Sequence, residues 1–278
     1  MNAPAIDYAK ADYYTDTSLV EDPHAYFHYL RNQGPVTRLP YRGVIAVTGY
    51  DEAVQVMLDT EHFSSINAVT GPIPGLPFEP HGDDITAQLE ANRHRIAFAD
   101  QIVTEEGKRH ADLRSVMSAL FTPSRLKALE PGLVSTADAL IDEFIASGKV
   151  DLPKQYGGPY ATLMIPDMLG IPEDGRKRFR AALENAVPAQ IGGDPEELKK
   201  NPLVKIGKDI FGYIAKRRLL NKPLIRPLAR AFGLTPGPDA SGREDILTEL
   251  ATAKYPDGAT PTLTDVTGLG AFLFGAGQ

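Results

Sequence analysis

The chain has 278 residues, of which 42% are apolar and 23% are charged, and its formal net charge is −7. These values are typical of a water-soluble globular protein, and the negative charge argues against nucleic acid as a partner. Cysteine is absent, which excludes a disulfide, a thiolate nucleophile and a thiolate-ligated metal among these residues. The mixed, acidic N-terminus indicates neither a signal peptide nor a membrane anchor, and a cytoplasmic location is expected. The short basic cluster Lys216-Arg217-Arg218 lies on a helical pattern and is expected to be a solvated helix face.

The N-terminal part of the chain predicts a short helix followed by a hairpin. Asp22 is a good helix N-cap, Pro23 suits the first helical position, and Gly34 with the proline after it predicts the end of the helix. Residues 36–39 and 44–48 flank a short turn and are rich in strand-forming side chains, so they predict a small sheet.

A second helix is predicted over residues 51–58, and a long loop follows it. Between Val69 and Asp84 four prolines alternate with three glycines, which excludes regular helix. The loop also carries Ile73, Leu76 and Phe78, apolar side chains that need something to cover them. A functional loop and a disordered connector explain this composition equally well.

From there the pattern is helical nearly to the end of the chain. Leu113, Val116, Met117 and Leu120 recur at helical spacing, which predicts one buried helix face. Further helices are predicted from Pro123 to the Gly148 stop and over residues 160–169, 173–187 and 195–220, with a connection over 223–242. The expected fold class is mainly α with a small N-terminal β-sheet, and residues 1–278 are expected to belong to one domain.

The last segment predicts a helix that is apolar most of the way round. Thr264 is its expected N-cap, and apolar residues such as Leu269 and Phe272 alternate with small ones. A helix of this kind belongs in the core of a larger body. The chain ends at Gln278 inside this helix, which would leave its last carbonyls without partners. The domain is therefore expected to be incomplete, and truncated within this helix.

Two cation-capable residues stand out because the usual catalytic constellations are missing. His110 and Arg114 are four residues apart, so their side chains project from one side of a helix, beside the apolar stripe. An anion with two carboxylates would satisfy both, since arginine offers a fork of donors to one carboxylate while histidine takes the other. An exposed histidine and an arginine paired to Asp112 or Glu106 would explain the same spacing.

Four motifs follow one another along the chain: Asp22-Pro23-His24 to Gly34-Pro35-Val36, Phe63-Ser64-Ser65, the HxxxR segment Glu105–Arg114 with Phe121-Thr122-Pro123, and Tyr255-Pro256-Asp257-Gly258 with Phe272-Leu273-Phe274-Gly275-Ala276-Gly277. Single motifs of this length are weak, but their order resembles that of the cytochrome P450 family, and the resemblance covers essentially the whole chain. It implies the P450 fold, with the N-terminal two-thirds of a single haem-thiolate domain present and the C-terminal part absent.

The resemblance also implies site residues. His110 and Arg114 match the pair that holds the haem propionates. Ala276 and Gly277 match the first two positions of a motif on the distal helix, whose small side chains let the backbone lie close to the porphyrin. The acid and threonine that complete this motif would follow Gln278, and the cysteine ligand would come later. No catalytic residue and no metal ligand is therefore expected within this chain.

Substrate contacts are expected from the segment after the long loop, from the distal helix and from the region around residues 187–191. The individual candidates are Phe98, Ile102, Val103, Phe272 and Gly275. Plain core packing is the alternative role for Phe272.

The implied activity is that of a soluble bacterial haem-thiolate monooxygenase, which inserts one atom of dioxygen into an apolar small organic substrate. It would use haem b and take electrons from NAD(P)H through a ferredoxin and its reductase. Lys108 and Arg109 either present positive charge to an acidic electron donor or are simply solvated.

A haem-free fragment or remnant acting as a binding or structural helical domain is the alternative function. The intact HxxxR pair argues against it. Histidine in place of cysteine as the iron ligand is a poor third hypothesis, because none of the six histidines lies on a proximal element.

Overall fold

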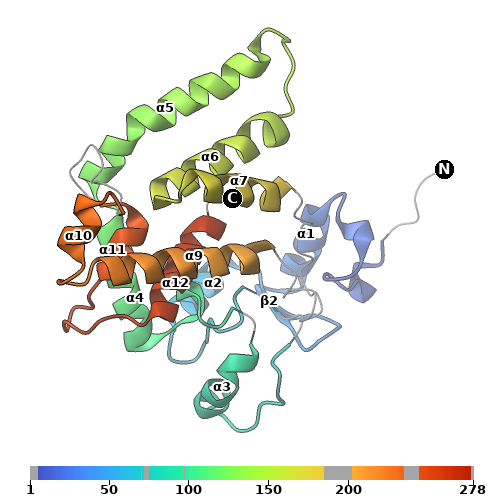
Figure 1. The fold of residues 1–278 in the computed structure, drawn as a ribbon. Coiled ribbons are helices and arrows are strands. Elements are labelled where there is room, and N and C mark those ends of the chain that lie inside the picture. Colours follow the sequence, from blue (N-terminus) through green and yellow to red (C-terminus); the bar gives the residue numbers. More distant parts are fainter. Residues whose placement is uncertain are drawn as a thin grey trace. The chain divides into compact units, whose positions relative to one another are not determined.

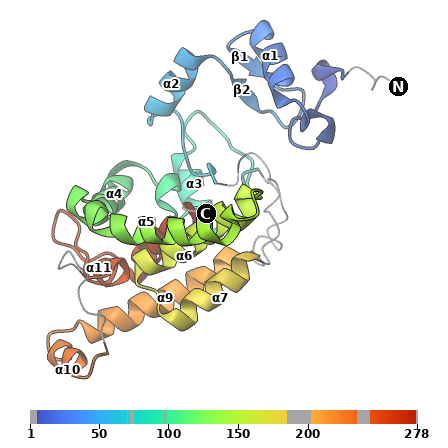
Figure 2. The same ribbon diagram turned by 90° about the horizontal axis from the view of Figure 1, so that it is seen from above.

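The computed structural model describes residues 6–69, 71, 75–96, 98–184, 202–234 and 244–276. These residues fall into two compact units, a smaller one that ends at Ala99 and a larger one that begins at Asp100 (Figures 1 and 2). Each unit is described by itself below. The assignment of residues 1–278 to one domain stays a prediction.

The smaller unit confirms the predicted helix and hairpin. Helix α1 (Pro23–Gln33) is capped by Asp22, whose Oδ1 accepts a hydrogen bond from the Ala25 amide at 3.2 Å. Strands β1 (Val36–Arg38) and β2 (Ile45–Val47) pair antiparallel. The remaining helices are α2 (Tyr50–Leu58) and α3 (Thr86–Asn92), with 3-10 turns at Tyr8–Lys10, Thr17–Leu19 and Arg93–Arg95.

The core of this unit is built on α1. Tyr26 and Leu30 are buried on one side of the helix, together with Leu19 and Leu39. Tyr26 also lies within ring-packing distance of several aromatic neighbours, and its closest parallel partner is Tyr13, with ring centroids 5.8 Å apart. The helix is thereby fixed against the segment that precedes it.

The larger unit is helical, which confirms the expected mainly α class with a small N-terminal sheet. Its helices are η4 (Ile102–Thr104), α4 (Gly107–Leu120), α5 (Pro123–Ile145), η5 (Leu152–Gly157), α6 (Gly158–Leu169), α7 (Glu173–Glu184), α9 (Pro202–Leu220), α10 (Arg226–Ala231), α11 (Ile246–Thr252) and α12 (Leu263–Ala276). Helix α5 begins as predicted, with the Thr122 side chain accepting from the Arg125 amide and Pro123 at the first position.

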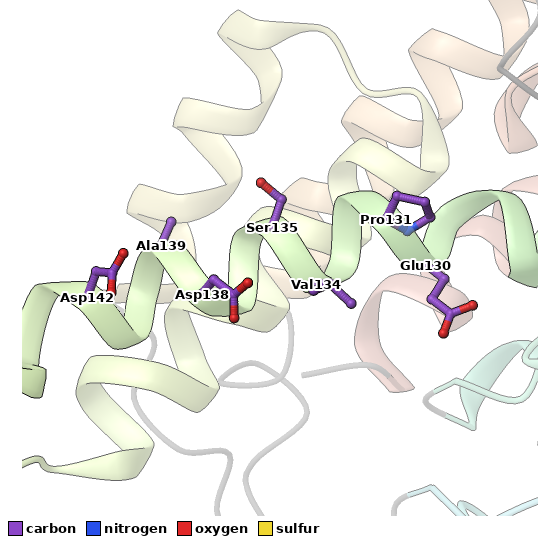
Figure 3. Close-up of a pocket in the computed structure, with 7 residues that line it drawn as sticks. All are labelled: Glu130, Pro131, Val134, Ser135, Asp138, Ala139 and Asp142. Atoms are coloured by element: carbon purple, nitrogen blue, oxygen red, sulfur yellow. The ribbon is translucent and has the colours of Figure 1, made fainter.

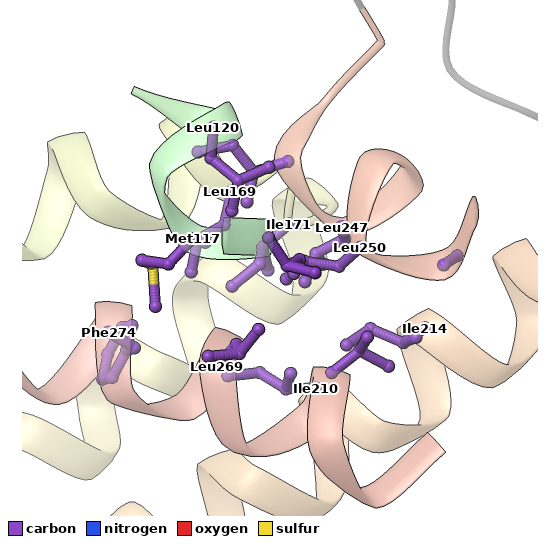
Figure 4. Close-up of a cluster of buried hydrophobic side chains, with 14 of the residues drawn as sticks. Met117, Leu120, Leu169, Ile171, Ile210, Ile214, Leu247, Leu250, Leu269 and Phe274 are labelled. Atoms are coloured by element: carbon purple, nitrogen blue, oxygen red, sulfur yellow. The ribbon is translucent and has the colours of Figure 1, made fainter. Parts of the chain in front are cut away.

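Helix α12 occupies the core of the larger unit and packs mainly on α9 (Figure 4). It also contacts α4, α6 and α11. Val266, Leu269 and Phe274 are buried, as its all-round apolar sequence predicted. The two helices approach closely at Gly270, where a Cβ would lie 3.0 Å from Cγ2 of Ile210 on α9.

Two expectations about the end of the chain are corrected. Thr264 does not cap α12: the helix begins at Leu263, and Thr262 caps it by accepting from the Asp265 amide at 3.1 Å. The connection predicted over residues 223–242 contains α10. The segments 185–201 and 235–243 lie outside the described residues.

The basic cluster on α9 is also not the solvated face that was predicted. Arg217 is buried, and its guanidinium donates to Thr248 Oγ1 at 3.1 Å and to the Gly170 carbonyl. Arg218 donates to two backbone carbonyls. Of the three residues only Lys216 is exposed. The two arginines therefore donate hydrogen bonds to acceptors on neighbouring elements. The charge pattern along one helix does not reveal these partners.

The substitution Gly170→Ala is expected to destabilise the protein more than Gly148→Ala. Both glycines have positive φ, 79° and 63°, so each substitution carries the same backbone cost. A Cβ at Gly170 would also lie 2.4 Å from Cβ of Asp245, whereas at Gly148 it meets open space. We expect about 1–3 kcal/mol of additional loss for Gly170→Ala, measured as the free energy of unfolding in urea. Equal losses would contradict the close approach of Gly170 to Asp245.

Candidate functional site

The predicted site residues of the larger unit come from three elements that contact one another. Ile102 and Val103 lie on η4, His110 and Arg114 on α4, and the remaining candidates on α12. Each pair among η4, α4 and α12 is in contact. Tertiary folding therefore brings together segments that are more than 150 residues apart in the chain.

His110 and Arg114 occupy the border of the buried face of α4. Leu113, Val116 and their neighbours on the predicted stripe are buried, while His110 is half-buried and Arg114 exposed. In the parts of the chain that the structure describes, neither side chain makes a hydrogen bond or an ion pair. Asp112 binds Lys108 instead, at 2.5 Å. The alternative in which Arg114 pairs with Asp112 is therefore wrong, and two cation-capable groups stay available to an external anion.

Helix α12 presents its predicted site residues near its C-terminal end. Phe272 is half-buried and packs against the core, which is the packing role that was considered for it. Its neighbour Phe274 is fully buried and meets Phe179 edge to face, with ring centroids 5.1 Å apart. Gly275 is half-buried and Ala276 exposed. Gly277 lies outside the described residues.

The other substrate candidates differ from one another in exposure. Ile102 is buried in the core of the larger unit, whereas Val103 beside it is exposed. Phe98 belongs to the smaller unit, is half-buried and has φ of 61°, a left-handed conformation that is uncommon for a residue with a side chain. Residues 187–191 lie outside the described part. Substrate contact stays a prediction for all of them.

A network of charges joins the start of α4 to the start of α12. The Arg109 guanidinium donates to Glu105 at 2.6 Å and to Asp265 at 3.0 Å, and both carboxylates are buried. The Tyr255 hydroxyl donates to the second oxygen of Asp265 at 3.0 Å. The Thr262 amide donates to that same oxygen at 2.8 Å. Asp265 therefore links the first turn of α12 to the segment that precedes the helix, through Tyr255 and Thr262, and to α4, through Arg109.

The ionisation of these groups follows from their contacts. Burial raises the pKa of Asp265, but its hydrogen bonds from Thr262 and Tyr255 and the charge of Arg109 outweigh burial and hold the pKa below its usual value. Burial, together with the hydrogen bond to Asp265, raises the pKa of Tyr255 well above its usual range. The tyrosine thus stays protonated as a donor and the aspartate stays ionised as an acceptor.

This network changes the interpretation of Lys108 and Arg109. Arg109 is bound by two buried carboxylates, and Lys108 contacts Asp112 and Asp257. Both side chains therefore make ion pairs within the chain, while 74% of the Lys108 side chain and 48% of the Arg109 side chain stay exposed. Contact with an acidic electron donor stays a prediction. Asp265 was not among the predicted site residues. Thr262 and Asp265 have the spacing of a capping box ahead of an apolar run, and this spacing is visible in the sequence.

A surface groove lies along α5 (Figure 3). Its lining comes from this one helix and includes three carboxylates: the residues are Glu130, Pro131, Val134, Ser135, Asp138, Ala139 and Asp142. None of the predicted site residues belongs to it.

Comparison with known proteins identifies the fold and the family. The chain has 42% sequence identity with the substrate-free cytochrome P450 CYP150A6 of Mycobacterium marinum, with a TM-score of 0.77 over 98% of this chain and 58% of that one. The chain belongs to the cytochrome P450 family. Among the curated relatives, the P450 monooxygenase PikC of Streptomyces venezuelae is 25% identical over 262 residues, which are 92% of this chain and 53% of the relative. No protein-family model matches the chain.

A further relative is 2-hydroxy-5-methyl-1-naphthoate 7-hydroxylase of Streptomyces carzinostaticus, 27% identical over 200 residues, which are 69% of this chain and 46% of that protein. The P450 chain thus spans about half the length of the curated relatives it matches. None of its described helices is long and apolar enough to cross a bilayer.

Substitution of Asp265 by asparagine is expected to lower the stability of this P450 chain at pH 7 by about 2 kcal/mol, because Arg109 and Tyr255 lose a charged acceptor. The folded-state pKa of Asp265 lies below the unfolded value of about 3.9. The stability that Asp265 contributes is therefore present above that pH and is lost as the pH falls through the folded-state pKa.

Urea unfolding at a series of pH values measures this effect. The Asp265→Asn variant should lose less stability than the unsubstituted protein on acidification below about pH 4. Asp257→Asn is the matched control, since Asp257 is an exposed partner of Lys108 and should change little. Identical acid profiles for the Asp265 variant and the unsubstituted protein would contradict the proposed link.

Proposed function

We propose that this chain forms part of a P450 monooxygenase that inserts one atom of dioxygen into an apolar small organic substrate. The observation that carries the proposal is the pair His110 and Arg114, whose side chains make no hydrogen bond or ion pair within the described residues, on a helix that contacts the buried helix α12. The relatives named as a monooxygenase and a hydroxylase support the same reaction class.

Haem b is the cofactor that the proposal requires, and the donor set of this chain fits it. A haem carries two propionate carboxylates, and α4 offers two cation-capable side chains at adjacent positions on one face. Arg114 would hold one propionate with its fork of donors and His110 the other. Ala276 and Gly277 would border the porphyrin, where small side chains are needed. The candidates Phe98, Ile102, Val103, Phe272 and Gly275 would contact the substrate.

When bound, haem supplies the iron at which dioxygen is activated. The proposed thiolate ligand has to come from outside these 278 residues, since they contain no cysteine. The proposed electron source is NAD(P)H, through a ferredoxin and ferredoxin reductase. Lys108 and Arg109, whose side chains are 74% and 48% exposed, would present positive charge to an acidic ferredoxin. The cytoplasmic location stays a prediction.

The absorption spectrum of the complete protein, which includes the segment with the proposed thiolate ligand, tests the reaction class when it is recorded after reduction under carbon monoxide. A strongly red-shifted Soret band is expected, because the proposal places a thiolate on the haem iron. A folded protein that shows no haem band after incubation with excess haem would instead favour the haem-free binding or structural domain.

Substitutions at the propionate pair test the site itself. Arg114→Gln and His110→Gln are each expected to cost about 1.5–3 kcal/mol of haem binding, since each removes a charge-assisted hydrogen bond. This corresponds to about a tenfold to a hundredfold higher dissociation constant, measured by titrating apoprotein with haem at the Soret band. Lys216→Gln on α9 is the matched surface control. Haem affinities unchanged in both variants would mean that α4 does not hold the propionates.

A further inference from the structure

An exposed apolar stripe follows the turn after α9 and continues through α10. The fractional exposure is 91% for Leu224, 61% for Leu228 and 74% for Phe232. The segment is wound helically, as the Phe232 amide donates to the Leu228 carbonyl at 3.0 Å. Spacing of four residues therefore places the three side chains along one side. Leu219 and Leu234, 50% and 53% exposed, extend the apolar surface at its two ends.

The stripe is not needed to hold α10 in place. Ala229 is the buried residue of this helix, and the chain after it is tied back by the bond from the Leu234 amide to the Ala229 carbonyl. Single exposed leucines are ordinary, but successive large apolar side chains on one exposed helical side indicate a surface that contacts something apolar. In Figures 1 and 2, α10 lies at the outer end of α9.

Cations accompany the stripe. Residues 210–234 contain six lysines and arginines and no acidic residue, in a chain whose net charge is −7. Arg217 and Arg218 point inward to their acceptors. Four cations remain on the outside of the segment: Lys216, Lys222, Arg226 and Arg230.

Only one carboxylate in the described parts of the chain offsets these four cations. Glu244 is shared by Arg226 at 3.8 Å and by Arg230 at 2.6 Å. Lys216 and Lys222 make no ion pair within the described residues. The outer surface of the segment is therefore both apolar and positively charged.

We propose that residues 216–234 dock on a membrane surface rich in anionic phospholipid. Leu224, Leu228 and Phe232 enter the boundary between headgroups and acyl chains, as the apolar side of an interfacial helix does. The lysines and arginines reach the lipid phosphates with their long side chains. This is peripheral docking of one surface segment, independent of the proposed reaction and of any membrane-spanning helix.

Charge favours an anionic lipid surface over a second copy of the chain. A two-fold contact through this segment would set the cations of one copy against the same cations of the other. An anionic bilayer is complementary to both features of the segment. Its acyl chains form an apolar layer for the exposed leucines and phenylalanine, and its headgroups form a layer of negative charge for the cations.

Co-sedimentation of the purified protein with vesicles tests the proposal. The protein is expected to bind vesicles of equal parts phosphatidylglycerol and phosphatidylcholine, and to bind pure phosphatidylcholine vesicles much more weakly. The triple variant Leu224→Ser, Leu228→Ser, Phe232→Ser should lower the partition coefficient at least about tenfold, because three apolar side chains no longer insert. Lys216→Gln and Lys222→Gln should each lower it about fivefold, an effect that high salt abolishes.

Val20→Ser is the matched control, since Val20 is a 76% exposed apolar residue of the smaller unit and should leave binding unchanged. All substituted positions are exposed, so circular dichroism should report an intact fold. The proposal is overturned if the protein ignores anionic vesicles, binds neutral ones equally well, or binds unchanged as the triple variant. A dimer in solution that the triple variant converts to monomer, without vesicle binding, would assign the surface to a second copy instead.

Discussion

Burial of α12 on nearly every side organises the larger unit, and the elements that carry the candidate site are packed around this helix. It approaches α9 closely at Gly270, where a Cβ would lie 3.0 Å from Cγ2 of Ile210. A Cβ at Gly268 would likewise lie 3.1 Å from the Asp100 carbonyl, so the chain leading into η4 also approaches α12 closely. The two glycines thus allow α12 to lie close to α9 and to the chain leading into η4, and α4 contacts both η4 and α12.

A second set of constraints is electrostatic. Buried carboxylates need compensating charge, since an uncompensated one would be expensive in the interior. Arg109 supplies it to Glu105 and Asp265, and the buried Arg217 is itself compensated by the half-buried Asp245 at 3.1 Å. On α4 this divides the cations into two groups. Arg109 holds α4 on α12, whereas His110, the next residue, and Arg114, more than one turn further on, make no side-chain hydrogen bond or ion pair within the described residues. The proposed cofactor site is this remaining pair.

The surface of α10 shows the opposite condition. There the chain leaves large apolar side chains and cations exposed together, with Glu244 as the nearby compensating group among the described residues. Because apolar exposure is unfavourable in water, such a surface is easiest to understand if a partner covers it. The two proposals rest on different residues, so haem binding and membrane docking can each fail without affecting the other.

The sequence by itself determined the local elements and the family. The local signals were the N-caps Asp22 and Thr122 and the apolar stripe of α4, which depend on residues within a few helical turns. The order of the motifs was enough to indicate a P450. Only the tertiary structure decided which cations are free, because Arg109 meets Asp265 across 156 residues and Arg217 meets acceptors on other elements. The tertiary structure also decided that the apolar side chains of α10 and the turn before it are exposed to solvent. Spacing along a chain reports neighbours on one helix face, while pairing across the core depends on how the helices pack.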